Sequence, residues 1–92
     1  MEKHCFIILY ELKTPMKDYT ALYNAIKSYE HWGKITSTSW AIVSELSYIA
    51  IRDNLSQYIG KDDRLMVIQS GHHAAWTNAM APNDWLKQNL IK

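Results

Sequence analysis

The sequence predicts a single α+β domain over residues 1–92, a ferredoxin-like sandwich of β-α-β-β-α-β order with a short C-terminal helix. Three observations lead to this prediction. A chain of 92 residues has room for one core only. Hydrophobic residues make up 48% of it, which is too many for a disordered chain. Two short apolar runs, residues 5–10 and 64–69, enclose segments with helical periodicity.

Residues 5–10 form the first predicted strand, which ends at Glu11. Apolar side chains occupy both of its faces, as is typical of a central strand covered on both sides. Thr14 and Pro15 interrupt the chain, and Asp18 is the predicted N-cap of a helix about three turns long. The apolar positions of this helix recur at helical spacing: Tyr19, Leu22, Tyr23, Ile26 and Tyr29.

Residues 31–34 are predicted as a loop, with Gly33 as its helix breaker. The following segment 34–44 is rich in β-branched, hydroxyl and aromatic residues, which favour extended chain. It is either one long bent strand or two strands joined by a tight bend near residues 36–39, and the sequence leaves both open.

Ser47 is the predicted N-cap of the second helix, which Gly60 ends. Its apolar face is Tyr48, Ile51, Leu55, Tyr58 and Ile59. Residues 61–63 form a polar turn before the strand 64–69. The core therefore covers residues 1–70. The tail 71–92 is predicted as a loop pinned by Trp76 and a short helix capped by Asn83.

Charge and cysteine content restrict the class of protein. A net charge of +1 gives no overall field that attracts nucleic acid, so any basic surface must be local. The single cysteine, Cys5, lies in an apolar run and is predicted to be a buried thiol, which suits a reducing compartment. The longest apolar stretch is too short to span a membrane and no signal peptide pattern is present, so we expect a soluble, cytoplasmic protein.

The predicted sheet has a face that needs cover. Right-handed crossovers place both core helices on one face, yet the strands carry apolar side chains on the other face as well. A second subunit or the C-terminal tail must cover that second face. Because a small domain gains stability from a partner, we expect a homodimer.

Four segments, taken in order, carry a resemblance to a known family. They are residues 8–12, the helix with Asp18 and residues 26–29, the segment 37–42 around Trp40, and residues 59–68 with the turn Asp62–Asp63. In this order and spacing the chain resembles the CRISPR adaptation Cas-two superfamily, which includes VapD-like ribonuclease toxins and bacterial proteins labelled SinR family. The SinR-labelled branch is the most similar, since its tail resembles residues 74–76 and 85–86 here.

The resemblance implies a ferredoxin-like homodimer that handles RNA or DNA, with a place in bacterial or phage defence. In some members, an Asp at the end of the first strand of each subunit holds Mg²⁺ or Mn²⁺, which activates water beside a phosphodiester. The matching residue is Glu11, which is therefore the candidate catalytic and metal-binding residue. Glu is one methylene longer than Asp, and other members are scaffolds that cleave nothing. A metal-dependent nuclease and a non-catalytic dimer that binds protein partners through its apolar tail both stay open.

Three further residues are candidates for binding nucleic acid. Lys13 and Lys34 are predicted phosphate contacts, and Trp32 could stack on a nucleobase. The alternative for each lysine is a solvated surface position, and for Glu11 a salt-bridged carboxylate. His72 and His73 are either plain loop residues or a source of a general acid. Asp62 and Asp63 are predicted as a polar turn, and Trp40, Trp76 and Trp85 as core or dimer-interface residues.

Overall fold

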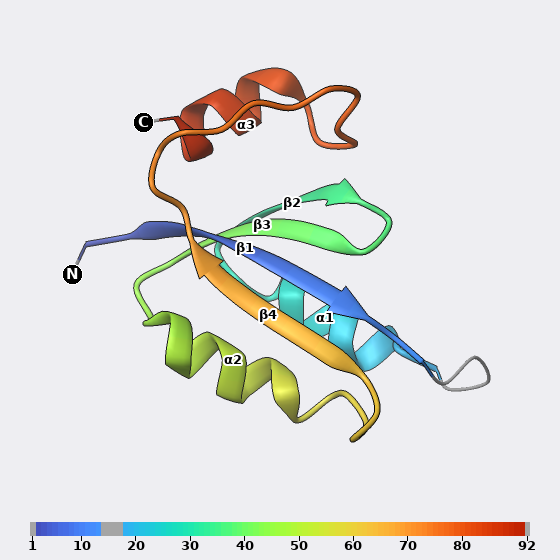
Figure 1. The fold of residues 1–92 in the computed structure, drawn as a ribbon. Coiled ribbons are helices and arrows are strands. Elements are labelled where there is room, and N and C mark those ends of the chain that lie inside the picture. Colours follow the sequence, from blue (N-terminus) through green and yellow to red (C-terminus); the bar gives the residue numbers. More distant parts are fainter. Residues whose placement is uncertain (1, 14–17, 92) are drawn as a thin grey trace.

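The computed structural model describes residues 2–13 and 18–91, so the predicted break at Thr14 and Pro15 lies outside the described residues. The elements are β1 (His4–Glu11), α1 (Thr20–Lys27), β2 (His31–Thr36), β3 (Ser39–Ser44), α2 (Tyr48–Ser56), β4 (Arg64–Gln69) and α3 (Asn83–Leu90). Their order is the predicted one, and they build a small single-domain α+β fold (Figure 1).

The four strands form one sheet in the order β2-β3-β1-β4, and every neighbouring pair is antiparallel. β1 is a central strand, as predicted. The open question about residues 34–44 is answered by two strands, with a turn at Ser37 and Thr38. The loop prediction for residues 31–34 is wrong, because β2 begins at His31. Gly33 lies inside this strand, where the absence of a side chain leaves room for Trp85 of α3.

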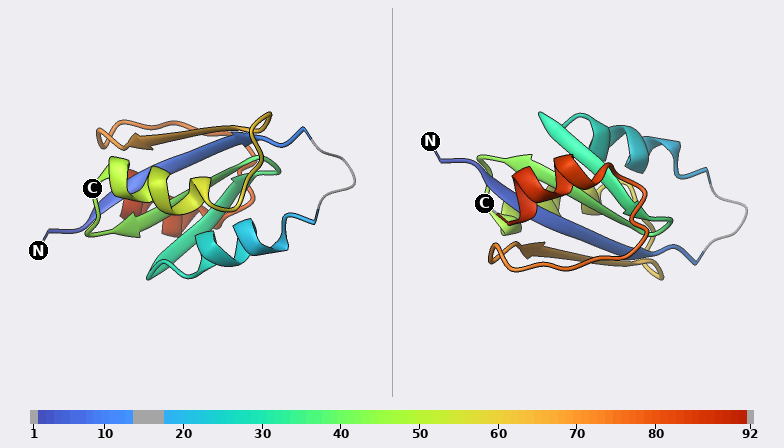
Figure 2. Two further views of the ribbon diagram at one scale, coloured as in Figure 1. Left: turned by 90° about the horizontal axis from the view of Figure 1, so that it is seen from below. Right: turned by 90° about the horizontal axis from the view of Figure 1, so that it is seen from above.

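Helices cover both faces of the sheet (Figures 1 and 2). α1 and α2 pack on one face, called here the front face, and α3 packs on the other, the back face. Alternate residues of the strands supply the two cores. The front core contains Phe6, Ile8, Trp40 and Ile42 with Leu22, Ile26, Ile51 and Leu55 from the helices. The back core contains Cys5 and Ala41 with Ala81, Leu86 and Leu90.

α3 covers only part of the back face. Over β1 and β4, the side chains of Leu9, Met66 and Ile68 are 37%, 57% and 43% exposed. These residues belong to one ladder, in which Leu9 pairs with Met66 and Ile7 pairs with Ile68. The tail thus supplies part of the cover that the sequence predicted, and an apolar strip of the sheet stays open.

The helix ends show which capping predictions hold. Ser47 caps α2, because its hydroxyl accepts the Ala50 N–H at 3.1 Å. Asp18 accepts the Thr20 N–H at 2.9 Å, but α1 begins later and has 8 residues, about two turns instead of three. The prediction that Asn83 caps α3 is wrong. Pro82 holds the cap position with extended backbone, and the side-chain oxygen Oδ1 of Asn83 instead accepts the Trp76 indole N–H at 3.0 Å.

Three residues of the predicted apolar face of α2 lie elsewhere. The helix ends at Ser56, so the prediction that Gly60 ends it is wrong, and Tyr58 and Ile59 follow the helix, where they pack partly buried against the front core. Ile51 and Leu55 are buried as predicted, but Tyr48 is 52% exposed. Tyr48 occupies the first position of the helix, where the chain has just left the sheet.

Candidate functional site

Glu11 lies at the end of β1, opposite Arg64 at the start of β4. Arg64 Nη1 donates a hydrogen bond to Glu11 Oε1 at 2.6 Å, and Lys13 Nζ lies 3.9 Å from the same oxygen. All three side chains are largely exposed to solvent. The structure therefore places Glu11 in a surface ion pair. Arg64 was not among the predicted site residues, because only the register between β1 and β4 brings it next to Glu11.

A metal ion at Glu11 would have to compete with these two cations. Among residues 2–13 and 18–91, no group of three or more His, Cys, Asp or Glu side chains is placed to hold a metal. A site shared between two copies would need the Glu11 carboxylate to leave Arg64 first, since an ion held by oxygen ligands needs free carboxylate oxygens.

Trp32 and Lys34 lie together on the front face of β2. The Trp32 ring centroid is 5.7 Å from that of Trp40, and Lys34 Nζ lies 5.3 Å from the Trp40 ring centroid. The ring of Tyr23 of α1 also stacks on Trp40, with ring centroids 6.4 Å apart, and its centroid lies 5.9 Å from Lys34 Nζ. Because residues 32 and 34 are two apart in a strand, both side chains point to the same face.

Lys27, in the last turn of α1, completes this group. Its Nζ lies 5.4 Å from the Trp32 ring centroid and 6.0 Å from that of Trp40. We name the group of Tyr23, Lys27, Trp32, Lys34 and Trp40 the β2 platform. Lys27 was not among the predicted site residues, although it lies four residues after Tyr23 and so on the same face of the helix.

The β2 platform combines the two kinds of group that bind nucleic acid without reading its sequence. Trp40 is buried, while Trp32 is 41% exposed, so Trp32 is the ring that a base can reach. The two ammonium groups lie within cation–π distance of the rings, which holds them against the aromatic surface. This arrangement can stack a base and contact its flanking phosphates.

The predicted site residues do not form one site. Glu11 shares the back face with Leu9, because residues two apart in a strand point to the same side. Lys13 lies beside Glu11. Trp32 and Lys34 lie on the front face of β2, the edge strand that β3 separates from β1. The structure thus divides the four candidates between two places: the ion pair cluster of Glu11, Lys13 and Arg64, and the β2 platform.

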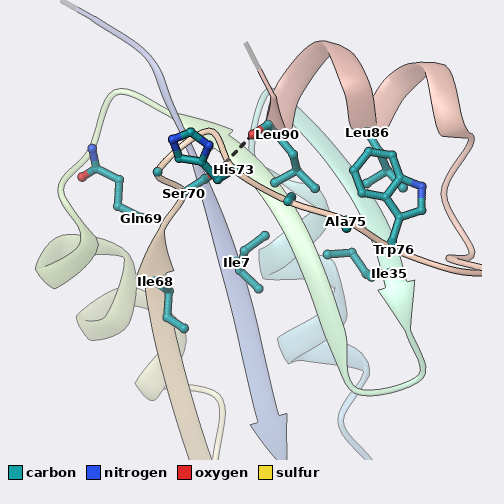
Figure 3. Close-up of a pocket in the computed structure, with 12 residues that line it drawn as sticks. Ile7, Ile35, Ile68, Gln69, Ser70, His73, Ala75, Trp76, Leu86 and Leu90 are labelled. Carbon is teal, nitrogen blue, oxygen red and sulfur yellow. Dashed lines mark hydrogen bonds between the residues drawn. The ribbon is translucent and has the colours of Figure 1, made fainter.

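A cavity of about 300 Å³ opens on the back face, between the sheet and the tail (Figure 3). Its walls are mostly apolar: Ile7, Ile35, Ile68, Trp76, Leu86 and Leu90. Gln69, Ser70 and His73 form a polar rim at one end, where the Ser70 hydroxyl donates to the Leu90 carbonyl at 3.4 Å. The cavity continues the apolar strip of Leu9, Met66 and Ile68.

Two buried groups near the strands have structural roles, the carboxylate of Asp63 and the thiol of Cys5. Residues 61 and 62 form the predicted turn, and the carboxylate of Asp63 is buried after it. Asp63 accepts hydrogen bonds from the Tyr19 hydroxyl at 2.8 Å and from the N–H groups of Lys13 and Gly60 at 2.7 and 2.8 Å. Cys5 is a buried free thiol, as predicted, and burial raises its pKa to about 11.

No protein family model, curated protein or solved structure matches this chain. The resemblance to the Cas-two superfamily stays a prediction for that reason. Across the described part of the chain, no helix has the length and apolar character that a membrane crossing requires.

Proposed function

We propose that this protein is a ferredoxin-like, Cas-two-like homodimer that binds nucleic acid through the β2 platform. The observation that carries the proposal is the placement of two lysine ammonium groups on one aromatic cluster. Lys27 of α1 lies over the exposed ring of Trp32, and Lys34 of β2 lies over the ring of Trp40, which contacts Trp32. The net charge of +1 gives little general attraction for phosphate, so a local cluster of this kind has to supply the binding.

The fold supports the ferredoxin-like part of this proposal. The element order and the strand order β2-β3-β1-β4 agree with two β-α-β units whose helices share one face. The open apolar strip of Leu9, Met66 and Ile68 supports the homodimer, since an exposed apolar patch marks an interaction surface.

Cleavage of RNA or DNA by Glu11 with Mg²⁺ or Mn²⁺ is the catalytic form of the proposal. It requires that Glu11 exchange Arg64 and Lys13 for a metal ion. Surface ion pairs contribute about 0–1 kcal/mol, so such an exchange is energetically accessible. The catalytic form is tested by incubating labelled RNA and DNA with Mg²⁺, Mn²⁺ or EDTA. Metal-dependent cleavage that is lost in Glu11→Gln supports it, and the absence of cleavage, or equal cleavage by both proteins, contradicts it.

The alternative function is that of a non-catalytic adaptor, which would bind protein partners through the apolar C-terminal tail. Leu86 and Leu90, two of the apolar side chains of that tail, are buried against the sheet of the same chain. They are therefore not available to a partner while α3 is docked. The β2 platform, whose Trp32 is accessible, supports nucleic acid in preference to this alternative.

Binding of fluorescently labelled single- and double-stranded RNA and DNA tests the proposal. We expect Trp32→Ala to weaken binding about fivefold or more, because stacking of one base contributes about 1–3 kcal/mol. Tyr48→Ala is the matched control, since it removes an exposed aromatic ring of α2 outside the platform. No binding by the unmodified protein, or equal losses in both variants, contradicts the proposal.

A further inference from the structure

We infer that two copies of this chain pair their β4 strands antiparallel across a twofold axis at Val67, so that two four-stranded sheets become one continuous sheet. The inference rests on the homodimer proposed above and names its interface.

The outer edge of β4 carries unpaired backbone groups. Ser70 N–H donates to Cys5 C=O at 2.8 Å, and in an antiparallel pair the residues that face the neighbour alternate. The even-numbered residues of β4 therefore bond to β1, and Leu65, Val67 and Gln69 direct their N–H and C=O groups outward. In the described part of the chain, no hydrogen bond reaches these outward groups.

The other edge of the sheet is protected and β4 is not. In β2 the register shifts between Lys34 and Thr36, and the Ile35 carbonyl accepts the Met80 N–H of the tail at 2.9 Å. β4 pairs in unbroken register, contains no proline, and exposes Met66 and Ile68 on its back face. Proteins usually block such an edge with a bulge, a proline or a covering segment, so an unblocked one is a ready pairing surface.

The layers leave space beside β4. β4 forms one margin of the sheet, and the chain after Gln69 rises from it toward the level of α3 (Figures 1 and 2). α2 packs below the sheet against β4 and α3 packs above it. A strand in the plane of the sheet can therefore approach this margin.

The strand favours one register. With the axis at Val67, Leu65 pairs with the partner's Gln69 and the two Val67 residues pair with each other, which gives roughly six backbone hydrogen bonds. With the axis at Met66, the shorter overlap gives roughly four backbone hydrogen bonds, and Arg64 would face the partner's Ile68. The Val67 register instead sets Met66 beside the partner's Ile68. It thereby joins the exposed apolar strips of the two copies.

This pairing has a consequence for Glu11. From about 3.4 Å per residue and 4.8 Å per strand, the two Glu11 residues of the dimer lie roughly 25 Å apart. One metal ion cannot bridge that distance. The two β2 platforms lie on the same face of the joined sheet, because the twofold axis is perpendicular to it. The β4 dimer thus fits nucleic acid binding and excludes a metal site shared by paired Glu11 residues.

Charge variants at the exposed pair test the interface and its register by light scattering over a range of protein concentrations. Met66→Lys with Ile68→Lys sets like charges opposite each other, and we expect the dissociation constant of the dimer to rise about tenfold or more. Met66→Lys with Ile68→Glu is the matched control, because it sets opposite charges together and keeps the dimer. Both side chains are exposed in the monomer, so circular dichroism should show an unchanged fold.

Each of the other possible results contradicts the homodimer, the β4 interface or the Val67 register. A monomer for the unmodified protein removes both the proposed homodimer and the β4 interface. A dimer that survives Met66→Lys with Ile68→Lys keeps the homodimer and removes the β4 interface. If the dimer of Met66→Lys with Ile68→Glu dissociates too, the Val67 register is wrong. As a second measurement, Val67→Cys should form an intermolecular disulfide under mild oxidation and Met66→Cys should not, since only Val67 faces its own copy.

Discussion

At the scale of single residues, Asp63 shows how one buried carboxylate connects distant parts of the chain. Its two oxygens accept hydrogen bonds from the backbone just after β1, from Tyr19 before α1, and from Gly60 in the turn before β4. The sequence predicted a polar turn here. It could not show that one Asp of the adjacent pair is buried, because the donors lie up to 50 residues away.

We predict that Asp63→Asn lowers the free energy of unfolding by about 2–3 kcal/mol. The amide NH₂ group would face the N–H and O–H donors that the carboxylate now accepts, and hydrogen bonds to charged groups contribute about 1.5–3 kcal/mol. Urea denaturation measures the change. Asp62→Asn, at the exposed neighbouring position, should stay within about 0.5 kcal/mol. Equal effects of the two substitutions would contradict this role of Asp63.

The buried thiol of Cys5 makes the free energy of unfolding depend on pH. Burial raises the pKa of its thiol from 9.0 to about 11, so the folded chain keeps this proton when the unfolded chain has released it. The unfolded state therefore binds fewer protons between about pH 9 and 11, and stability falls there as pH rises. Guanidinium unfolding of the unmodified protein and of Cys5→Ala checks this. The difference between their free energies of unfolding should be constant below pH 9. Above pH 9 the unmodified protein should lose stability relative to Cys5→Ala, and a difference that stays constant at all pH values would contradict this prediction.

At the scale of elements, the position of α3 depends on a residue without a side chain. A Cβ atom at Gly33 would lie 2.8 Å from an atom of the Trp85 ring and 3.1 Å from the Ala81 Cβ. Gly33 was predicted as a helix breaker in a loop. The local sequence cannot reveal its actual role, because the contact joins β2 to a helix some 50 residues later.

We predict that Gly33→Ala displaces α3 and destabilises the protein by about 1–3 kcal/mol, the usual cost of overpacking. Hydrogen exchange should quicken in α3 while β1 stays protected. Gly71→Ala is the control, since a Cβ atom at Gly71 meets nothing within 4 Å. If both variants exchange at the unmodified rate, the packing of Trp85 on Gly33 does not hold α3 in place.

Other elements were predictable because their signals are local. The strand 64–69 was predicted with its observed ends, and Ser47 with its capping role, since an apolar run and a capping hydroxyl act within a few residues. β2 was missed at its start because His31, Trp32 and Gly33 form a strand only by pairing with β3.

At the scale of the whole molecule, the sequence predicted the layered fold but not the grouping of its candidate residues. Trp32 and Lys34 meet at Trp40 because a strand alternates its faces, and this follows only once β2 is known. Glu11 meets Arg64 through a register that joins residues 53 positions apart. The division between the ion pair cluster and the β2 platform is therefore a property of the sheet.

If the β2 platform binds the phosphates of nucleic acid, its affinity for RNA must depend on salt concentration. We expect the affinity for single-stranded RNA to fall steeply with salt, and Lys34→Gln to reduce the slope of log K against log salt by about 0.7. Lys61→Gln, which removes an exposed lysine from the turn before β4, should leave the slope unchanged. Absence of binding at low salt, or a slope that Lys34→Gln does not alter, would show that the β2 platform is not a phosphate-binding surface.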